Sequence, residues 1–135
     1  MDSKAIEGGC FCGAIRYVVD AKPLGSMICH CKTCRKIAGA MVVPWLTFPL
    51  DQFRITRGQP TKFESSPGVH RMHCAACSTT LTYSGPKFPD EVDVVTTTLD
   101  DPNAFPPTHH SWVSHDLKWT KFGDGLPQYP ESRTG

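Results

Sequence analysis

The seven cysteines of this chain fall into three short groups, and this grouping limits the fold more than any other feature of the sequence. In chain order the groups are Cys10-Phe-Cys12, Cys29-His-Cys31-Lys-Thr-Cys34 and Cys74-Ala-Ala-Cys77. Thiolates spaced in this way can surround one small ion, and tetrahedral zinc is the usual occupant of such sites. A closed structural site uses four cysteines, so the remaining three predict a second zinc with one open position for chemistry.

Disulfide bonds explain this pattern less well than metal binding does. An odd number of cysteines leaves one thiol unpaired, and Cys29 could pair with Cys31 only within a strained ring. Residues 1–7 lack the apolar run of a secretory signal. Burial of single thiols as small hydrophobic side chains would not collect them into three groups. We therefore predict reduced, metal-binding thiols and a cytoplasmic protein.

The spacing also indicates how the thiols divide between two ions. Residues i and i+2 of an extended segment face the same way, so a C-x-C pair can bind one ion. The second group, Cys29, Cys31 and Cys34, can share an ion at one strand-to-helix corner, which leaves the first and third groups to form the four-cysteine site. The competing division joins Cys31 and Cys34 to the third group as an ordinary zinc ribbon. We disfavour it because its three remaining cysteines come from separate segments.

Composition and charge limit the classes of protein and partner. With 135 residues and a mass of 14.9 kDa, we predict one domain over residues 1–135 with a modest core. The formal net charge is +1; two zinc ions add four positive charges and seven thiolates add seven negative ones, which gives −2 for the loaded protein. The sequence has no basic run and no apolar stretch of about 20 residues, so we expect neither nucleic acid nor a membrane as partner.

The secondary-structure pattern is mostly β. Eleven glycines and twelve prolines favour turns and short strands over long helices. Segments rich in β-branched and aromatic residues predict strands at 14–19, 41–48, 53–56, 61–65, 69–73, 80–83 and 92–98. Pro44 predicts that the strand at 41–48 is broken or lies at a sheet edge. A short helix is expected over 33–40, and a hairpin should surround the third cysteine group.

A zinc ion held by three thiolates favours a particular chemistry. It is net negative, so it acidifies bound water less than a zinc on three neutral histidines. A thiol, in contrast, binds zinc as a thiolate and is kept nucleophilic near neutral pH. Thiol activation is therefore the first prediction for the second site, and hydrolysis the second. Arg35, next to Cys34, is the candidate for binding an anionic substrate group, with a solvated surface charge as the alternative.

The histidines and tryptophans give weaker signals. His30 lies between two cysteines, so its side chain should point away from their shared ion. Strand alternation predicts that one of His109 and His110 faces solvent and the other faces inward. The tryptophans are expected in the core or in a pocket wall.

Ordered motifs run along the chain: 9–17 (GCFCGAIRY), 29–35 (CHCKTCR), 71–77 (RMHCAAC) and 98–102 (TLDDP), followed by Trp119 and 123–127 (GDGLP). Together they resemble the glutathione-dependent formaldehyde-activating (GFA, or centromere protein V-like) family, over about residues 8–129. Family members usually carry glycine after the last C-x-x-C, where this chain has Ser78. Glycine would ease a left-handed turn, so Ser78 has to tolerate that conformation or alter the loop.

The resemblance implies a β-tent zinc-binding fold with short helical segments and two zinc ions. It assigns the structural zinc to Cys10, Cys12, Cys74 and Cys77, and the catalytic zinc to Cys29, Cys31 and Cys34. It also implies a carbon–sulfur lyase, cytoplasmic, that joins formaldehyde to glutathione as S-hydroxymethylglutathione. Another small thiol or electrophile is possible, and the alternative of a different class is a non-catalytic zinc module that binds a protein or nucleic-acid partner. The sequence leaves the oligomeric state open.

Overall fold

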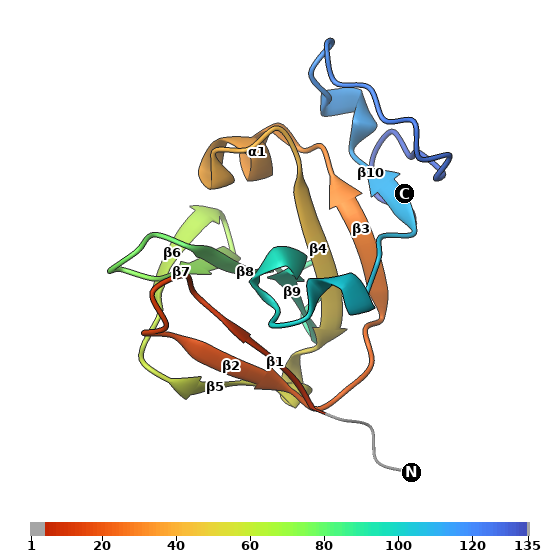
Figure 1. Cartoon of the computed structure of the whole chain (residues 1–135). Helices are drawn as coiled ribbons and strands as arrows, with labels where there is room; N and C mark the ends of the chain where they lie inside the picture. The colour runs from red at the N-terminus through yellow and green to blue at the C-terminus, as the bar shows by residue number, and fades with distance from the viewer. Residues whose placement is uncertain (1–4, 135) are drawn as a thin grey trace.

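A computed structural model describes residues 5–134, which form two β-sheets (Figure 1). The smaller sheet is antiparallel, with the strand order β1-β2-β5. Its strands are β1 (Ile6–Gly9), β2 (Arg16–Val19) and β5 (Phe53–Arg57). In Figure 1 it lies at the lower left, under the larger sheet.

The larger sheet has seven strands within residues 5–134, in the order β10-β3-β4-β9-β8-β7-β6. Neighbouring strands are antiparallel, except that β10 runs parallel to β3. The strands are β3 (Gly25–Cys29), β4 (Val43–Pro49), β6 (Thr61–Ser66), β7 (Val69–His73), β8 (Thr80–Ser84), β9 (Glu91–Val95) and β10 (His109–Ser111). The prediction of a mostly β chain is confirmed.

Short helical segments connect these strands. The α-helix α1 (Lys32–Ala38) ends at Gly39, whose φ of 65° lies in the left-handed region that favours glycine. The 3₁₀ turns are η1 (Leu50–Gln52), η2 (Thr96–Thr98), η3 (Pro102–Ala104) and η4 (Val113–His115). The predicted helix and the predicted hairpin around the third cysteine group are both present. The strand predicted at 92–98 ends earlier, because η2 turns the chain after Val95.

The prediction that Pro44 marks a broken or edge strand was wrong. Strand β4 lies between β3 and β9 in the larger sheet. Pro44 pairs with Ile28 on one side, but the β9 register begins only at Trp45, opposite Val95. Proline is therefore tolerated because β9 has already ended where its missing N–H would have been needed.

The two faces of the larger sheet carry different clusters. Alternate residues of β4 and β9, such as Leu46 and Val94, face the smaller sheet and build the main core. Cys10 and Cys74 belong to this core. The opposite face carries a second buried cluster of Cys29, Cys34, Val43, Trp45 and Val95. The sheet thus separates the four-cysteine group from the three-cysteine group.

The segment 98–102 docks the N-terminal hairpin onto the rest of the protein. The Tyr17 hydroxyl lies 2.7 Å from Thr98 Oγ1, and Arg16 donates to both carboxylate oxygens of Asp100 at 2.9 and 2.5 Å. The backbone N–H of Asp100 donates to the Glu7 carbonyl at 2.9 Å. These contacts hold in place the hairpin whose turn carries Cys10 and Cys12.

His109 and His110 are both buried, at 6% and 0% exposed, so the prediction that one faces solvent was wrong. Strand β10 pairs with β3 on one side, and residues 127–129 cover its other edge. The N–H of His110 donates to the Pro127 carbonyl at 2.8 Å, and the N–H of Tyr129 donates to the His110 carbonyl at 2.9 Å. No helix within residues 5–134 has the length and apolar character needed to cross a membrane.

Candidate metal centres

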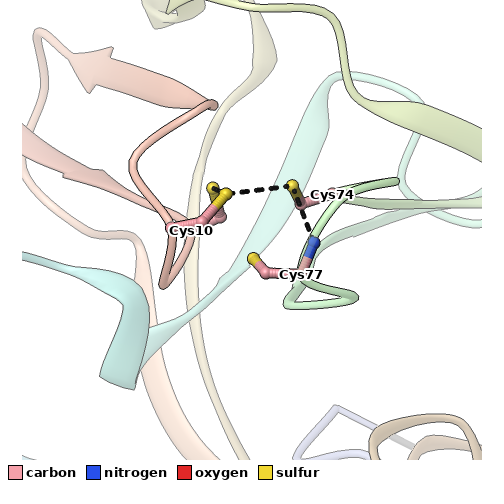
Figure 2. Close-up of side chains that lie close together, drawn as sticks. Cys10, Cys74 and Cys77 are labelled. Atoms are coloured by element: carbon pink, nitrogen blue, oxygen red, sulfur yellow. Dashed lines mark hydrogen bonds between the residues drawn. The ribbon is translucent and has the colours of Figure 1, made fainter.

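The four cysteines of the first and third groups meet between two loops. Cys10 and Cys12 lie in the turn between β1 and β2, and Cys74 and Cys77 lie in the turn between β7 and β8. Figure 2 shows Cys10, Cys74 and Cys77 turning their sulfur atoms toward one another. All four sulfur atoms lie within 4.8 Å of one another, with Cys12 Sγ 3.7 Å from Cys10 Sγ and 3.8 Å from Cys74 Sγ.

These separations fit one tetrahedral ion. Four sulfurs at about 2.3 Å from a central zinc lie about 3.8 Å apart, along the edges of the tetrahedron. Backbone N–H groups also point at the sulfurs: Ile15 N donates to Cys10 Sγ at 3.2 Å, and Cys77 N donates to Cys74 Sγ at 3.4 Å. Such donors favour the thiolate form that a metal requires. The four-cysteine group can therefore hold a metal ion.

Thr79 connects the two loops of this group. Its hydroxyl accepts a hydrogen bond from the Phe11 N–H at 3.1 Å and lies 3.2 Å from Cys77 Sγ. Hydrogen bonds, the largest effect being that of the Thr79 side chain, lower the pKa of Cys77 to about 5. Sequence reasoning gave Thr79 no role, because a threonine two residues after a C-x-x-C resembles any strand residue.

Ser78 has a φ of 67° and so adopts the left-handed conformation, the first of the two alternatives given for this position. A residue with a Cβ atom is disfavoured in this conformation, so Ser78→Gly is expected to raise the free energy of unfolding by about 1 kcal/mol. The higher conformational entropy of glycine in the unfolded chain offsets part of this gain. Urea denaturation of the metal-loaded protein measures this change. Ser78→Ala is the control, since it keeps the Cβ atom and should give no gain. A less stable Ser78→Gly protein would contradict the strain argument.

The second cysteine group lies on the other face of the larger sheet, at the corner between β3 and α1. Cys29 ends β3, Cys31 precedes the helix, and Cys34 lies in its first turn. Their sulfurs lie within 4.8 Å of one another, and Cys29 Sγ is 3.8 Å from Cys34 Sγ. Hydrogen bonds from Cys29 and Cys34 hold the pKa of Cys31 below its usual value. Within residues 5–134 no fourth cysteine, histidine or acidic side chain completes the group, which can therefore hold an ion with one position left over.

Arg71 of β7 lies directly against this group. Its Nη1 and Nη2 atoms are each 3.6 Å from Cys34 Sγ, and its Nε donates to Ser65 Oγ at 3.0 Å. The guanidinium also lies 4.9 Å from the centre of the Tyr83 ring, and the side chain is only 4% exposed. A buried cation in this place offsets part of the negative charge of three thiolates. Arg71 begins the motif at 71–77, but nothing in the sequence indicated its contact with Cys34.

A cavity of about 300 Å³ opens beside the three-cysteine group. Cys29, Cys31 and Cys34 line it together with Trp45 and Trp112, which agrees with the prediction of pocket-wall tryptophans. Arg71, Tyr83 and Asp93 are among the polar residues of the sheet that line it. Trp119 is 69% exposed and lies outside this lining. A small molecule in the cavity would therefore contact the cysteine sulfurs.

Arg35 and His30 point elsewhere. The Nη1 atom of Arg35 donates to the carbonyls of His30 at 3.0 Å and His115 at 2.6 Å, and Arg35 is not part of the cavity lining. Its role in substrate binding stays a prediction. His30 Nε2 lies 2.9 Å from His110 Nδ1, and His110 Nε2 lies 2.8 Å from Asp124 Oδ2. His30 is thus turned away from the cysteines that flank it, as predicted.

Comparisons with known proteins agree over most of the chain. Residues 5–115 match the family model described as "Glutathione-dependent formaldehyde-activating enzyme". A Halomonas elongata protein named "Putative glutathione-dependent formaldehyde-activating enzyme" is 28% identical over 126 residues, which cover 86% of this chain and 80% of that protein. The crystal structure of a Rhodobacter sphaeroides protein is similar with a TM-score of 0.60 at 19% identity, covering 91% of this chain and 98% of that one. This last likeness concerns the fold alone.

Proposed function

Because this chain belongs to the glutathione-dependent formaldehyde-activating family, we propose that it is a zinc-dependent carbon–sulfur lyase. The proposed reaction joins a thiol, with glutathione as the first candidate, to formaldehyde or a related small electrophile, and also runs in reverse. The observation that carries this proposal is the group of three cysteines, without a fourth ligand within residues 5–134, that lines a cavity of about 300 Å³.

Zinc is the proposed metal at both cysteine groups. Thiolate ligands are soft and favour zinc, copper(I) or iron–sulfur clusters, and isolated tetrahedral groups of four or three cysteines are typical of zinc. Cys10, Cys12, Cys74 and Cys77 would hold the structural ion. Cys29, Cys31 and Cys34 would hold the catalytic ion, which would supply one position for a substrate sulfur and lower the pKa of that thiol.

Two features of the residues around the cavity support this chemistry. The positive charge of Arg71 at Cys34 reduces the net negative charge that would repel an incoming thiolate. Trp45 and Trp112 line the cavity with apolar surface, which would limit the access of water to a reactive electrophile. In the reaction itself a bond forms between the substrate sulfur and the carbonyl carbon, and the thiol proton ends on the carbonyl oxygen. No electrons are exchanged with another reagent.

The competing reading, a zinc module that only binds a partner, would need a closed second site. None of the histidine, cysteine or acidic side chains described in residues 5–134 closes it, and His30, between Cys29 and Cys31 in the sequence, forms a hydrogen bond with His110 instead. A catalytic site with reduced thiols also requires a reducing compartment, so we propose the cytoplasm as the location.

X-ray absorption at the zinc edge tests the proposed thiol ligation. On addition of saturating glutathione, one of two zinc ions should exchange an oxygen or nitrogen ligand for sulfur, because thiolates compete well against water on zinc. S-Methylglutathione, which has no free thiol, is the control and should leave the spectrum unchanged. A spectrum that glutathione does not alter would favour the binding module over the lyase.

A further inference from the structure

A row of side chains crosses the larger sheet beside the three-cysteine group. The strand registers place Thr47 of β4 opposite Asp93 of β9, Asp93 opposite Tyr83 of β8, and Tyr83 opposite Arg71 of β7. Side chains opposite each other on neighbouring strands share one face of a sheet. Arg71 contacts Cys34 Sγ at 3.6 Å, so the row leads from the cysteine group to a carboxyl group.

Asp93 occupies a distinctive place in this row. Among the described residues that line the cavity of about 300 Å³, it is the one carboxylic acid. It also lines a neighbouring cavity of about 200 Å³, which contains His109 and Arg133 but none of the cysteines. The Asp93 side chain therefore borders both the cavity beside the three thiols and the second cavity.

The surroundings of Asp93 suit a group that gains and loses a proton near neutral pH. Burial raises the pKa of Asp93 to about 6, although a hydrogen bond that Thr47 Oγ1 donates to Asp93 Oδ1 at 2.6 Å and the charge of Arg71 lower it. The other titratable or charged groups around the carboxyl are Glu91 on its own strand, Tyr83 on β8, Lys87 before β9, His109 on β10 and Arg133. A proton-transfer group is most effective when its pKa lies near the working pH.

We propose that Asp93 transfers the thiol proton to the carbonyl oxygen of the electrophile, an inference that rests on the proposed lyase function. The Asp93 carboxylate accepts the proton as the substrate thiol becomes a thiolate. The sulfur then forms a bond with the carbonyl carbon, and the electron pair of the C=O bond moves to oxygen. Asp93 returns the proton to that oxygen, which gives a hydroxymethyl thioether and restores the carboxylate. The reverse reaction uses the same steps in the opposite order.

Tyr83 and Arg71, which also line the cavity, are less suited to this role. Burial raises the pKa of Tyr83, so its phenol would hold its proton at the start of the reaction rather than accept one. Arg71 is engaged with Cys34 and Ser65 and has no acceptor for a proton. His109 lies in the neighbouring cavity and does not line the one that contains the thiols.

Proton release on thiol binding tests this inference without turnover. Zinc-loaded protein is titrated with glutathione by calorimetry at pH 7, in buffers that differ in ionisation enthalpy. In the parent protein Asp93 should keep most of the thiol proton, since a new thiolate nearby raises the pKa of a carboxyl. Asp93→Asn removes the acceptor, so the number of protons released per thiol should rise toward one. Asp51→Asn, an exposed position in η1, is the matched control and should behave like the parent protein.

The pH profile of formaldehyde exchange gives a second measurement. Asp93→Asn should lower kcat about 10²- to 10⁴-fold, the usual contribution of a proton-transfer group, with two zinc ions retained. In the parent protein kcat/KM should rise with pH through the pKa of Asp93. Thr47→Val removes a hydrogen bond that lowers this pKa, so the same rise should shift to higher pH.

The outcomes separate this inference from the function on which it rests. If glutathione binds but Asp93→Asn releases the same number of protons and retains its rate, Asp93 is not the transfer group and the lyase proposal stands. If glutathione does not bind to zinc-loaded parent protein, the lyase proposal fails and the role of Asp93 fails with it. Asp93 has only a structural role if two results occur together. Asp93→Asn has a lower rate and has also lost zinc, and Thr47→Val does not shift the pH dependence of kcat/KM.

Discussion

Cys74→Ser is expected to unfold the protein, whereas Cys31→Ser is expected to leave it folded with about one zinc ion in place of two. Cys74 is 1% exposed and packs in the main core between the two sheets, where its sulfur lies 3.8 Å from that of Cys12. Cys31 is only half-buried and lines the cavity on the opposite face. Loss of the metal should therefore unfold the protein at the four-cysteine group but not at the three-cysteine group.

The size of this difference follows from the chain connectivity. An ion at the four-cysteine group would join the β1–β2 turn to the β7–β8 turn and so close a loop of about 60 residues. Such a cross-link stabilises by about 4 kcal/mol on chain-entropy estimates. The free energy of binding a structural zinc, about 10–16 kcal/mol in small zinc domains, adds to the stability of the folded state. The three-cysteine group spans only residues 29–34 and constrains almost no loop.

Metal analysis and thermal unfolding measure both variants against the parent protein. We expect two zinc ions in the parent protein, about one in Cys31→Ser with the β-sheet circular dichroism kept, and an insoluble or molten Cys74→Ser. Cys12→Ser, the most exposed member of the four-cysteine group, serves as a matched partner and should lose the same ion as Cys74→Ser. Equal behaviour of Cys74→Ser and Cys31→Ser, or one zinc in the parent protein, would contradict the division of the cysteines.

The grouping of the cysteines could be predicted from the sequence because their spacing is local. A C-x-C or C-x-x-C pair is close in space whatever the rest of the fold does, so only the joining of Cys10 and Cys12 to Cys74 and Cys77 had to be inferred across the chain. The strands rich in β-branched residues were predicted for the same local reason. Strands β1, β3 and β10 were not among the predicted ranges. Ile6–Gly9 ends in two glycines, and His109–Ser111 is a strand only through its pairing with β3.

The cavity could not be predicted in the same way. Arg71 is 37 residues from the sulfur it contacts, and Asp93 is 46 residues from the hydroxyl that bonds to it. Each looks in the sequence like an ordinary charged residue on a strand, which alternation would place on a solvated face. Only the register of four strands brings them to one side of the sheet beside Cys34. The grouping of Cys29, Cys31 and Cys34 could therefore be predicted from the sequence, and the polar residues around that group could not.

The second large effect is expected in catalysis. Exchange of formaldehyde with S-hydroxymethylglutathione, followed by NMR against the uncatalysed rate, should be accelerated by the two-zinc protein, and Cys31→Ser should lose all of that acceleration. The reason is that, in the proposed function, the three-cysteine group provides the position at which the thiol would bind as a thiolate. A folded Cys31→Ser protein with one zinc that still accelerates exchange would place the chemistry elsewhere. If the parent protein adds nothing to the background rate, formaldehyde is the wrong electrophile, and other thiol adducts are tested next.

Arg71 and Arg35 should affect this reaction in different ways. Arg71→Gln removes the charge next to Cys34, and a hydrogen bond to a charged group contributes about 1.5–3 kcal/mol, so kcat/KM should fall about 10- to 150-fold. Arg35→Ala, if Arg35 binds a carboxylate of glutathione as the sequence predicted, should mainly raise KM and leave kcat near the parent value. Arg54→Gln, exposed on β5, is the control and should change neither.

The comparison is informative only for variants that keep their metal, so the zinc content of each is measured first. Arg71→Lys then separates charge from geometry. It retains the positive charge but cannot reproduce the two N–H groups that lie at 3.6 Å from Cys34 Sγ, and should recover only part of the lost kcat/KM. If Arg71→Gln with two zinc ions bound turns over at the parent rate, the charge beside Cys34 does not assist thiol activation. The three-cysteine group would then activate the substrate thiol without a contribution from Arg71.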